Sequence, residues 1–505
     1  MTLDLNKSIE VSASNFGFLG LSKVLVQVTH LLILAVITRN LGTELFGKMS
    51  VFLMVTQFLY CLTVSWTAIG YTRFSMINAN KGNPISEVFW CRNLVVFTLV
   101  LLTGGMLIAG RSQLVDYLDL PSPIILIVFL HLFSLLTTDY ANQVAQVTTE
   151  FKQLSVLQLI EKGLILVLVW TVGKNLFTIL WIYIGTCLLC RIYFLMSSGR
   201  HACWPFGFNL SLCKKFLRFS YPLLLTSFGG FVFGWVDIAI VKHFSSLHDV
   251  GIYSLAYSGL GAVESIVLLM PAVLTPIFIT LAVQHREDTT VRFIRRILPQ
   301  ISYLWGFVFM LAGLISIWLI PLAFGPAFIQ SVNVFLVLLV CLNLSVMNAL
   351  IVPIFVGYNM VSKMVIVNFT ASILNLVLDM ALVPHIGIMG AAMATTFSYC
   401  CVTISYSFLI KSRFDSIFGV SWLFFGIVCI QLAGLVLFKP WFICIAISLA
   451  ACGIYVWGSR YLGVFSSDDK AIYNSLEMPL FLKKSLMRIC DYPGFRGRSQ
   501  KPTSF

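Results

Sequence analysis

Charged residues are scarce in this chain. Only 10% of its 505 residues are charged, whereas 59% are hydrophobic and the mean hydropathy is +0.94. About a quarter of the residues in a typical soluble domain are charged, so this composition excludes an ordinary water-soluble fold. It predicts an all-α membrane protein that crosses the bilayer many times.

Motifs for nucleotide and metal chemistry are also missing. The sequence has no G-x-x-x-x-G-K-[ST] loop, no zinc-ligand spacing and no G-x-S-x-G motif, and "GLGAVE" at 259–264 lacks the spacing of a dinucleotide fingerprint. We therefore expect no cofactor. A transporter built from this chain would have to use an ion gradient, with a proton or a sodium ion as the coupling ion.

Long apolar runs dominate what is present. A helix needs about twenty apolar residues to cross the hydrocarbon core. Dividing the chain at its polar and Pro/Gly breaks predicts fourteen such spans. The expected spans are 16–37, 48–69, 88–109, 123–144, 155–173, 175–195, 217–241, 251–282, 297–320, 332–352, 364–383, 388–410, 418–437 and 439–458.

Lysine and arginine are distributed unequally along these spans. The N-terminus, the even-numbered loops and the tail together hold 25 of the 33 basic residues, when Arg92, Arg191 and Arg218 near span ends are assigned to the adjoining loops. By the positive-inside rule, both termini are then cytoplasmic. The net charge of +13 reflects this orientation, and we expect no nucleic-acid partner. The basic tail, 459–505, could lie on anionic headgroups or be simply solvated.

Two similar elbows indicate an internal repeat. Aligning "ITRNLGTELFG" at 37–47 with "IVKHFSSLHDVG" at 240–251 pairs Arg39 with Lys242 and Gly47 with Gly251. Because glycine adopts positive φ readily, Gly42 and Gly47 predict a tight turn that serves as scaffold. Such a repeat predicts two six-helix lobes with a substrate path between them. The expected divisions are an N-terminal lobe at 1–200, an amphipathic cytoplasmic linker at 201–216, a C-terminal lobe at 217–410, two extra spans at 411–458 and the tail at 459–505.

The first two spans carry the candidate substrate-binding residues. Ionisable groups inside a bilayer are costly unless they are paired or hydrated, so each is a functional candidate. Lys23, Gln27 and His30 share one helix face, and no acidic residue in that span can pair with Lys23. Tyr60 and Arg73 extend the set along the second span. For the hydroxyl groups of that span, hydrogen bonding between helices is the alternative.

Carboxylates in the second half are the candidate ion-coupling groups. They are Asp237, Glu264 and Asp379. Glu264 has no basic neighbour within one helical turn, so it is the preferred titratable group. Asp237 could instead pair with Lys242, and Asp379 lies near a span end, where it could simply be hydrated.

Four stretches together resemble a known family. They are "TRNLGTELFGKMSVFLMV", "LCKKFLRFSYPLLLTSFGG", "VDIAIVKHFSSLHDVGIYSLAYS" and "LNLVLDMALVPHIGIMGAAMATTFSY". Over about residues 10–410 the chain resembles the polysaccharide transporter family of the multidrug/oligosaccharidyl-lipid/polysaccharide exporter superfamily, and bacterial O-antigen flippases most of all. The resemblance implies two six-helix bundles forming a V in the bacterial inner membrane. It also implies transfer of an undecaprenyl-diphosphate-linked oligosaccharide to the outer leaflet, with a polysaccharide polymerase and a chain-length regulator as possible protein partners.

Two alternatives remain open. A multidrug or lipid II exporter of the same superfamily would share the fold, although the resemblance implies several cavity arginines for lipid II and this chain offers mainly Lys23 and Arg73. A multispanning glycosyltransferase or polymerase could use Asp116 and Asp119 of the outer loop "RSQLVDYLDLPSP" as its acids. The outer loops are short, which favours simple solvation of these two side chains.

Overall fold

The computed structural model describes residues 5–80, 84–148, 150–197, 204, 206–415, 419–438 and 440–465. These residues form helices joined by short connections, and no β-strand occurs among them. Within this part, thirteen helical segments are long and apolar enough to cross a membrane. The predicted all-α, multiply spanning architecture is therefore confirmed. The basic tail predicted at 459–505 lies outside the described residues from position 466 onward.

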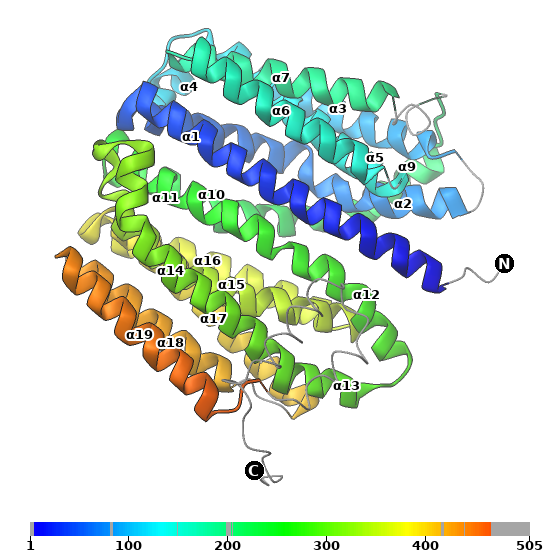
Figure 1. Cartoon of the computed structure of the whole chain (residues 1–505). Coiled ribbons are helices and arrows are strands. Elements are labelled where there is room, and N and C mark those ends of the chain that lie inside the picture. The colour runs from blue at the N-terminus through cyan, green and yellow to red at the C-terminus, as the bar shows by residue number, and fades with distance from the viewer. Residues whose placement is uncertain are drawn as a thin grey trace.

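The first helix contains two of the predicted spans. Helix α1 (Leu5–Thr63) continues through the elbow but is sharply bent at Gly42, where φ is 71° and ψ is −177°. Its apolar part, Gly20–Thr63, has 44 residues. At 1.5 Å per residue this part is about 66 Å long, twice the thickness of the hydrocarbon core. The bend in Figure 1 thus produces two crossings, and the thirteen segments correspond to the fourteen predicted spans. Gly42 has the predicted positive φ and Gly47 does not.

The rest of the N-terminal lobe packs on one side of α1, and α10 and α11 of the other lobe contact α1 as well. Its second crossing ends in a short 3₁₀ turn, η1, before the chain resumes as α2. The elements are η1 (Ser65–Thr67), α2 (Ala68–Asn80), α3 (Ser86–Ala109), α4 (Arg111–Leu118), α5 (Ile124–Thr148), α6 (Phe151–Thr171) and α7 (Leu176–Ser197).

A short amphipathic helix, α9 (Leu210–Ser220), joins the two lobes. The Asn209 side chain caps it by accepting hydrogen bonds from two backbone N–H groups of its first turn. Phe216 and Ser220 are buried, whereas the basic side chains of α9 are exposed. A Cβ atom at Gly70 of α2 would lie only 2.1 Å from Ser220 Oγ, so α9 is packed tightly on α2. The predicted linker therefore rests on the N-terminal lobe.

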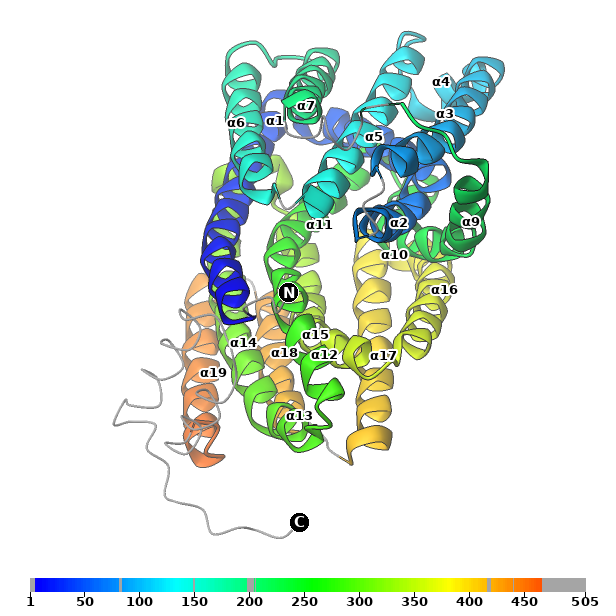
Figure 2. The same cartoon turned by 90° about the vertical axis from the view of Figure 1, so that its right-hand side faces the viewer.

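The C-terminal lobe is built around α15 (Ser331–Gly357), which is almost completely buried. The other elements are α10 (Leu223–Phe244), α11 (Leu247–Val267), α12 (Leu269–Val283), α13 (Glu287–Arg292), the π-helical turn η2 (Phe293–Ile297), α14 (Leu298–Phe324), η3 (Pro326–Phe328), α16 (Val361–Ile386), α17 (Ile388–Phe414), α18 (Gly419–Leu437) and α19 (Trp441–Tyr461). Figure 2 shows the two lobes above and below each other, with α9 at the side of α2 and α10. Helices α18 and α19 pack on α14.

The two elbows meet at one end of the molecule, which we call the elbow end. A Cβ atom at Gly47 would lie 2.0 Å from the carbonyl oxygen of Leu247, and one at Gly251 would lie 2.1 Å from the carbonyl oxygen of Thr43. The contact is reciprocal, as expected for two repeats related by an approximate twofold axis. Only glycine allows the backbones to approach this closely. Gly47 and Gly251, which the sequence repeat aligns with each other, are therefore in direct contact in the structure.

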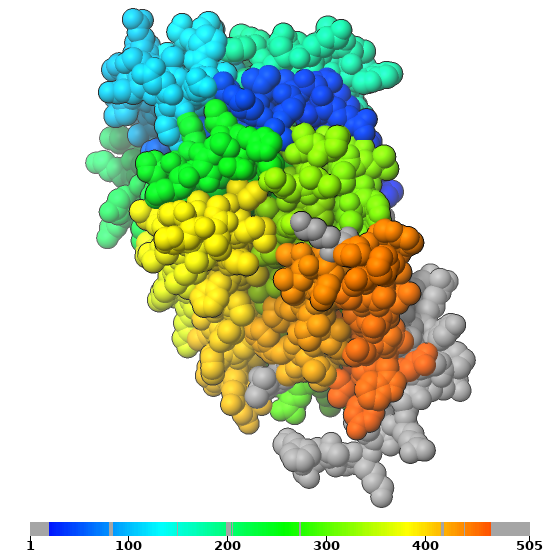
Figure 3. Space-filling model, turned by 90° about the vertical axis from the view of Figure 1, so that its left-hand side faces the viewer, coloured from blue at the N-terminus to red at the C-terminus, as the bar shows by residue number. Residues whose placement is uncertain are grey.

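Side chains reinforce this contact between the lobes. Arg39 Nε of α1 donates a hydrogen bond to the carbonyl oxygen of Ala323 in α14 at 2.9 Å. Thr43 Oγ1 lies 2.6 Å from His248 Nδ1 of α11. In Figure 3 the blue atoms of α1 lie directly against green atoms of the C-terminal lobe at this end. The lobes are therefore closed against each other at the elbow end.

Candidate functional site

A cavity of about 240 Å³ lies between the two lobes. Both halves of α1 line it, together with α5, α7, α10 and α11. Its polar and aromatic side chains are His30, Phe46, His131, Tyr183, Trp235, Tyr257 and three serines, and the rest of the lining is aliphatic. Among the residues that the structure describes, no lysine, arginine, aspartate or glutamate lines this cavity. Both lobes therefore contact anything bound here.

The predicted substrate-binding residues of the first span lie at different depths. His30 lines the cavity, whereas Gln27 and Lys23 do not. Lys23 precedes His30 by seven residues, which corresponds to about 10 Å along the helix toward its N-terminal end. Its side chain is half-buried, and none of the ion pairs within the described residues includes it. Lys23 is thus a cation near the cavity without a carboxylate partner among these residues.

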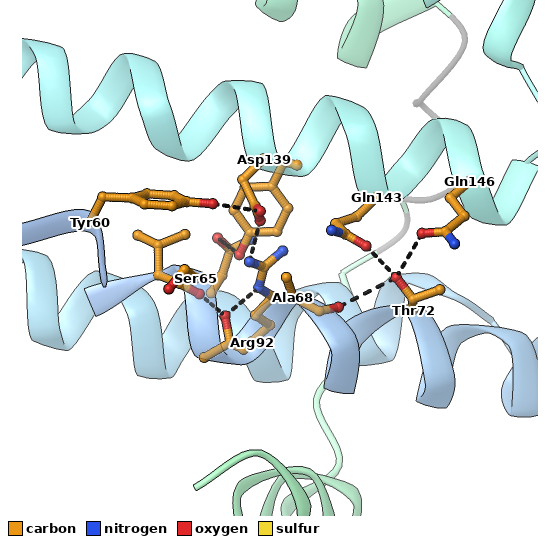
Figure 4. A network of polar contacts seen from close by, with 12 residues as sticks. Tyr60, Ser65, Ala68, Thr72, Arg92, Asp139, Gln143 and Gln146 are labelled. Atoms are coloured by element: carbon orange, nitrogen blue, oxygen red, sulfur yellow. Dashed lines mark hydrogen bonds and ion pairs between the residues drawn. The ribbon is translucent and has the colours of Figure 1, made fainter. Parts of the chain in front are cut away.

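Tyr60 belongs to a buried network in the N-terminal lobe (Figure 4). Its hydroxyl donates a hydrogen bond to Asp139 Oδ1 at 2.9 Å. The other carboxylate oxygen of Asp139 forms an ion pair with Arg92, which is completely buried. Arg92 Nε donates to Thr67 Oγ1 in η1 at 2.8 Å, and its guanidinium carbon lies 4.4 Å from the centre of the Tyr140 ring. The network therefore connects the end of α1 and the turn η1, which leads into α2, to α3 and α5.

We expect Arg92→Leu to lower the free energy of unfolding by about 3–5 kcal/mol, because the carboxylate of Asp139 would lose its buried partner. Thermal unfolding of the purified protein in detergent measures the change. Lys48→Ala is the matched control, since Lys48 pairs with an aspartate that is 66% exposed, and its effect should stay below about 1 kcal/mol. Equal shifts in the two variants would contradict a stabilising role for the buried pair.

Arg73 is separated from the cavity. It is exposed on α2, and its guanidinium carbon lies 4.4 Å from the centre of the Phe219 ring on α9. It therefore lies beside the linker helix. The structure does not bring Tyr60 and Arg73 together with Lys23 and His30, and a role for either in substrate binding stays a prediction.

A second buried ion pair joins α6 to α7. Arg191 NH2 lies 2.7 Å from Glu161 Oε2, and both side chains are almost inaccessible to solvent. Lys162 Nζ lies 3.8 Å from Glu161 Oε1 and 5.5 Å from the centre of the Tyr183 ring, which lines the cavity. The assignment of Arg92 and Arg191 to loops was therefore wrong, because both are neutralised inside the lobe. The basic bias toward one side of the membrane persists without them.

Two of the predicted coupling carboxylates are in contact. Asp237 of α10 and Asp379 of α16 are 2% and 0% exposed, and their side chains are within hydrogen-bonding distance of each other. Tyr253 and Thr395 donate hydrogen bonds to Asp237 Oδ2, the latter at 2.8 Å. Asn375 Nδ2 donates to Asp379 Oδ2 at 3.0 Å. Four helices of the C-terminal lobe thus converge on this acidic pair.

The structure rejects the two simpler explanations of these carboxylates. Asp237 does not pair with Lys242, whose Nζ lies 3.6 Å from the centre of the Tyr117 ring instead. Asp379 is not hydrated at a helix end, since it is fully buried. Both explanations considered only neighbours along the same helix. The spacing of residues in the sequence does not show which other helices pack against Asp237 and Asp379.

Three buried oxygens around the acidic pair have no hydrogen-bond donor: Asp237 Oδ1, Asp379 Oδ1 and Asn375 Oδ1. Buried polar atoms nearly always have a partner, and an unsatisfied one is costly. A proton shared by the carboxyl groups would satisfy two of these oxygens. A hard cation such as sodium would fit too, because such ions prefer oxygen ligands. The donor set therefore suits either coupling ion.

Glu264 lies apart from this pair, on α11. It is half-buried, and its Oε1 accepts hydrogen bonds from Ser345 Oγ at 3.2 Å and from the Tyr399 hydroxyl at 3.1 Å. Neither oxygen of Glu264 is among the buried atoms without a partner in the described part of the chain, whereas each member of the acidic pair has one such oxygen. The role of Glu264 as the first coupling candidate stays a prediction.

Sequence reasoning missed several polar residues of these sites. Asp139 lies inside a predicted span, so its charge was a visible signal. His131 is in the same span and lines the cavity. Trp235 carried no signal, because an aromatic residue in an apolar span is ordinary.

Comparisons with known proteins agree with this architecture. A sequence profile described as polysaccharide biosynthesis protein matches residues 12–282. The structure is similar to that of lipid II flippase MurJ in an inward closed conformation, with a TM-score of 0.66 and 14% identity, covering 90% of this chain and 99% of that one. A comparison with curated protein sequences gave no match.

Multidrug transporters are similar as well. A point mutant of the Vibrio cholerae MATE transporter VcmN has a TM-score of 0.55 and 14% identity, covering 82% of this chain and 100% of that one. A multidrug resistance MATE family transporter of the MOP superfamily, inward-facing, has a TM-score of 0.58 and 11% identity, covering 82% and 96%. At such identities these structures establish the fold alone. Because the sequence profile spans more than half of the chain, the protein belongs to the polysaccharide biosynthesis protein family and has the fold of MOP-superfamily transporters.

Proposed function

We propose that this protein is a flippase for undecaprenyl-diphosphate-linked oligosaccharide, the repeat unit of an O-antigen, capsule or exopolysaccharide. It moves this substrate from the cytoplasmic to the outer leaflet of the bacterial inner membrane, with both termini in the cytoplasm. The observation that carries the proposal is a cavity shared by both lobes, with Lys23 about 10 Å away on the same helix and in no ion pair among the described residues. Membership of the polysaccharide biosynthesis family supports it.

The chemistry of the substrate explains this arrangement. A diphosphate and its sugars must cross about 30 Å of hydrocarbon while the lipid tail stays in the membrane. The serine and histidine side chains of the cavity between the lobes lower the cost of taking these polar groups out of water. The ammonium group of Lys23 supplies a positive charge for the diphosphate. Closure at the elbow end leaves the path to be entered from the opposite end, which is the cytoplasmic end in the proposed orientation.

The acidic pair couples transport to an ion gradient in this proposal. Helices α10 and α11 carry Asp237 and Tyr253, and the same two helices line the cavity with Trp235 and Tyr257. A proton or sodium ion bound between Asp237 and Asp379 therefore acts on the helices that contact substrate. An ion shifts a conformational equilibrium only if it binds the two states with different affinity, and a buried pair of acids provides such a difference.

The alternative hypothesis of an enzyme finds little support in the outer loop. Asp116 and Asp119 are both exposed at the elbow end, and Asp119 Oδ2 lies 2.7 Å from Lys48 Nζ. The hydrogen bond and the charge of Lys48 hold the pKa of Asp119 below its usual range, so this carboxyl is a poor proton donor. The main alternative is an exporter of drugs or of lipid II. Drug susceptibility in an efflux-deficient strain distinguishes a multidrug exporter from the proposed flippase.

Deleting the gene should cause lipid-linked oligosaccharide to accumulate on the cytoplasmic leaflet and should remove the polymer from the cell surface. The reason is that the proposed function makes this protein the step that moves the unit across the membrane. Extracted lipid-linked sugars and surface polymer are measured in deletion and complemented strains. A polymerase would behave differently: its deletion would leave single units exported normally and abolish only chain extension.

A further inference from the structure

The cavity between the lobes is chemically unlike the surroundings of Lys23. Its wall combines aliphatic side chains and aromatic rings with three serine hydroxyls and two histidines, and no lysine, arginine, aspartate or glutamate among the described residues lines it. A charged group enclosed there would find no cation of the wall to pair with. Lys162, whose Nζ lies 5.5 Å from the centre of the Tyr183 ring, is already paired with Glu161. The diphosphate and the cavity contents therefore lie at different depths along α1.

Two polar atoms of the cavity-lining residues have no partner. His30 Nδ1 in the N-terminal lobe and Ser254 Oγ in the C-terminal lobe are buried and form no hydrogen bond. This contrasts with the other histidine of the wall, because His131 Nδ1 lies 2.9 Å from Thr56 Oγ1. Unsatisfied buried groups are rare in proteins, and here both residues line the same cavity, one from each lobe. A hydroxyl group of a bound molecule reaches these two atoms when the side chains turn toward the cavity.

Flat aromatic surfaces complete the wall. Trp235 of α10 and Tyr257 of α11 are half-buried and line the cavity. A pyranose ring has an apolar face of C–H groups and a rim of hydroxyls, so its face suits an aromatic ring and its rim suits polar atoms. The cavity has a volume of about 240 Å³. This volume accommodates a single sugar ring.

We infer that the cavity is a subsite for one uncharged sugar ring of the substrate, stacked on Trp235 and hydrogen-bonded to His30 and Ser254. The inference rests on the proposed flippase function. The diphosphate then lies about 10 Å farther from the elbow end, beside Lys23. The sugar enters first, and it touches both lobes at once. A ring that carries a carboxylate at this position is disfavoured, because the wall offers it no lysine or arginine.

Binding of defined carriers to the purified full-length protein tests this inference. The probes are undecaprenyl diphosphate, its N-acetylglucosamine conjugate and its galacturonic acid conjugate, and the measurement is the dissociation constant in nanodiscs. Trp235→Ala and Trp235→Phe are compared with Trp318→Ala, since Trp318 lies on α14 and is 45% exposed. Thermal unfolding establishes that each variant is folded.

We expect the parent to bind the N-acetylglucosamine conjugate about tenfold more tightly than the sugar-free carrier, as one stacked ring and its hydrogen bonds provide. Trp235→Ala should lose this gain and keep its affinity for the sugar-free carrier, whereas Trp235→Phe and Trp318→Ala should retain most of it. The galacturonic acid conjugate should show no gain. Lys23→Ala should weaken binding of all three probes by a similar factor.

Two results would overturn the sugar subsite while leaving the flippase intact. One is equal affinity of the parent for the carrier with and without N-acetylglucosamine. The other is a Trp235→Ala variant that weakens both probes alike. If the parent binds none of the carriers, the proposed function itself fails, and the subsite fails with it.

Discussion

Lys23→Ala should reduce transport about ten- to a hundredfold while the protein still inserts and folds. A hydrogen bond from a charged donor contributes about 1.5–3 kcal/mol, and each 1.4 kcal/mol corresponds to a factor of ten. The structure makes Lys23 the natural partner of a diphosphate, because no ion pair within the described residues occupies it. Surface polymer at matched membrane abundance measures the effect.

Lys23→Arg should keep a good part of the activity, since the guanidinium group preserves the positive charge and forms hydrogen bonds with phosphate. Lys363→Ala is the matched control, because this lysine of α16 is exposed. It should behave like the parent. Wild-type amounts of surface polymer in Lys23→Ala would disprove a role for this cation in the path.

Asp237→Asn should abolish the response of transport to an imposed proton or sodium gradient. The amide cannot take up a proton, and it removes one negative charge from the acidic pair with Asp379. Reconstituted vesicles measure flipping with and without each gradient, which also identifies the ion. Asp288→Asn, at an exposed carboxylate of α13, is the control and should respond like the parent.

Glu264→Gln provides the comparison within the C-terminal lobe. Since Glu264 is only half-buried and has no buried oxygen without a partner among the described residues, we expect this variant to keep more of its gradient response than Asp237→Asn. If the order is reversed, Glu264 is the coupling group, and the acidic pair has only a structural role.

The arrangement along the chain was largely predictable from the sequence. Apolar runs of about twenty residues predicted the crossings, because the bilayer thickness sets the length of a spanning helix. The elbow at Gly42 followed from glycine chemistry, and the repeat paired Gly47 with Gly251, which touch in the structure. Each of these features depends on local sequence or on an internal repeat, both of which a single sequence displays.

The partners of the buried charges were not predictable. Arg92 and Asp139 are 47 residues apart, and Asp237 and Thr395 are 158 residues apart. Helical spacing shows which side chains share a face, but not which helix packs against that face. For the same reason Lys23, His30 and Tyr60 were all predicted to bind substrate, although His30 lines the cavity and Tyr60 binds the buried carboxylate of Asp139.

The most direct measurement of the proposed function is flipping by the purified protein in vesicles that contain undecaprenyl-diphosphate-linked N-acetylglucosamine. A membrane-impermeant galactosyltransferase, added outside, labels only the molecules in the outer leaflet. A flippase predicts that labelling rises beyond the outer-leaflet fraction toward completion, and that Lys23→Ala vesicles remain near that fraction. Labelling that stops at the same level in parent, Lys23→Ala and protein-free vesicles would contradict the proposed transport.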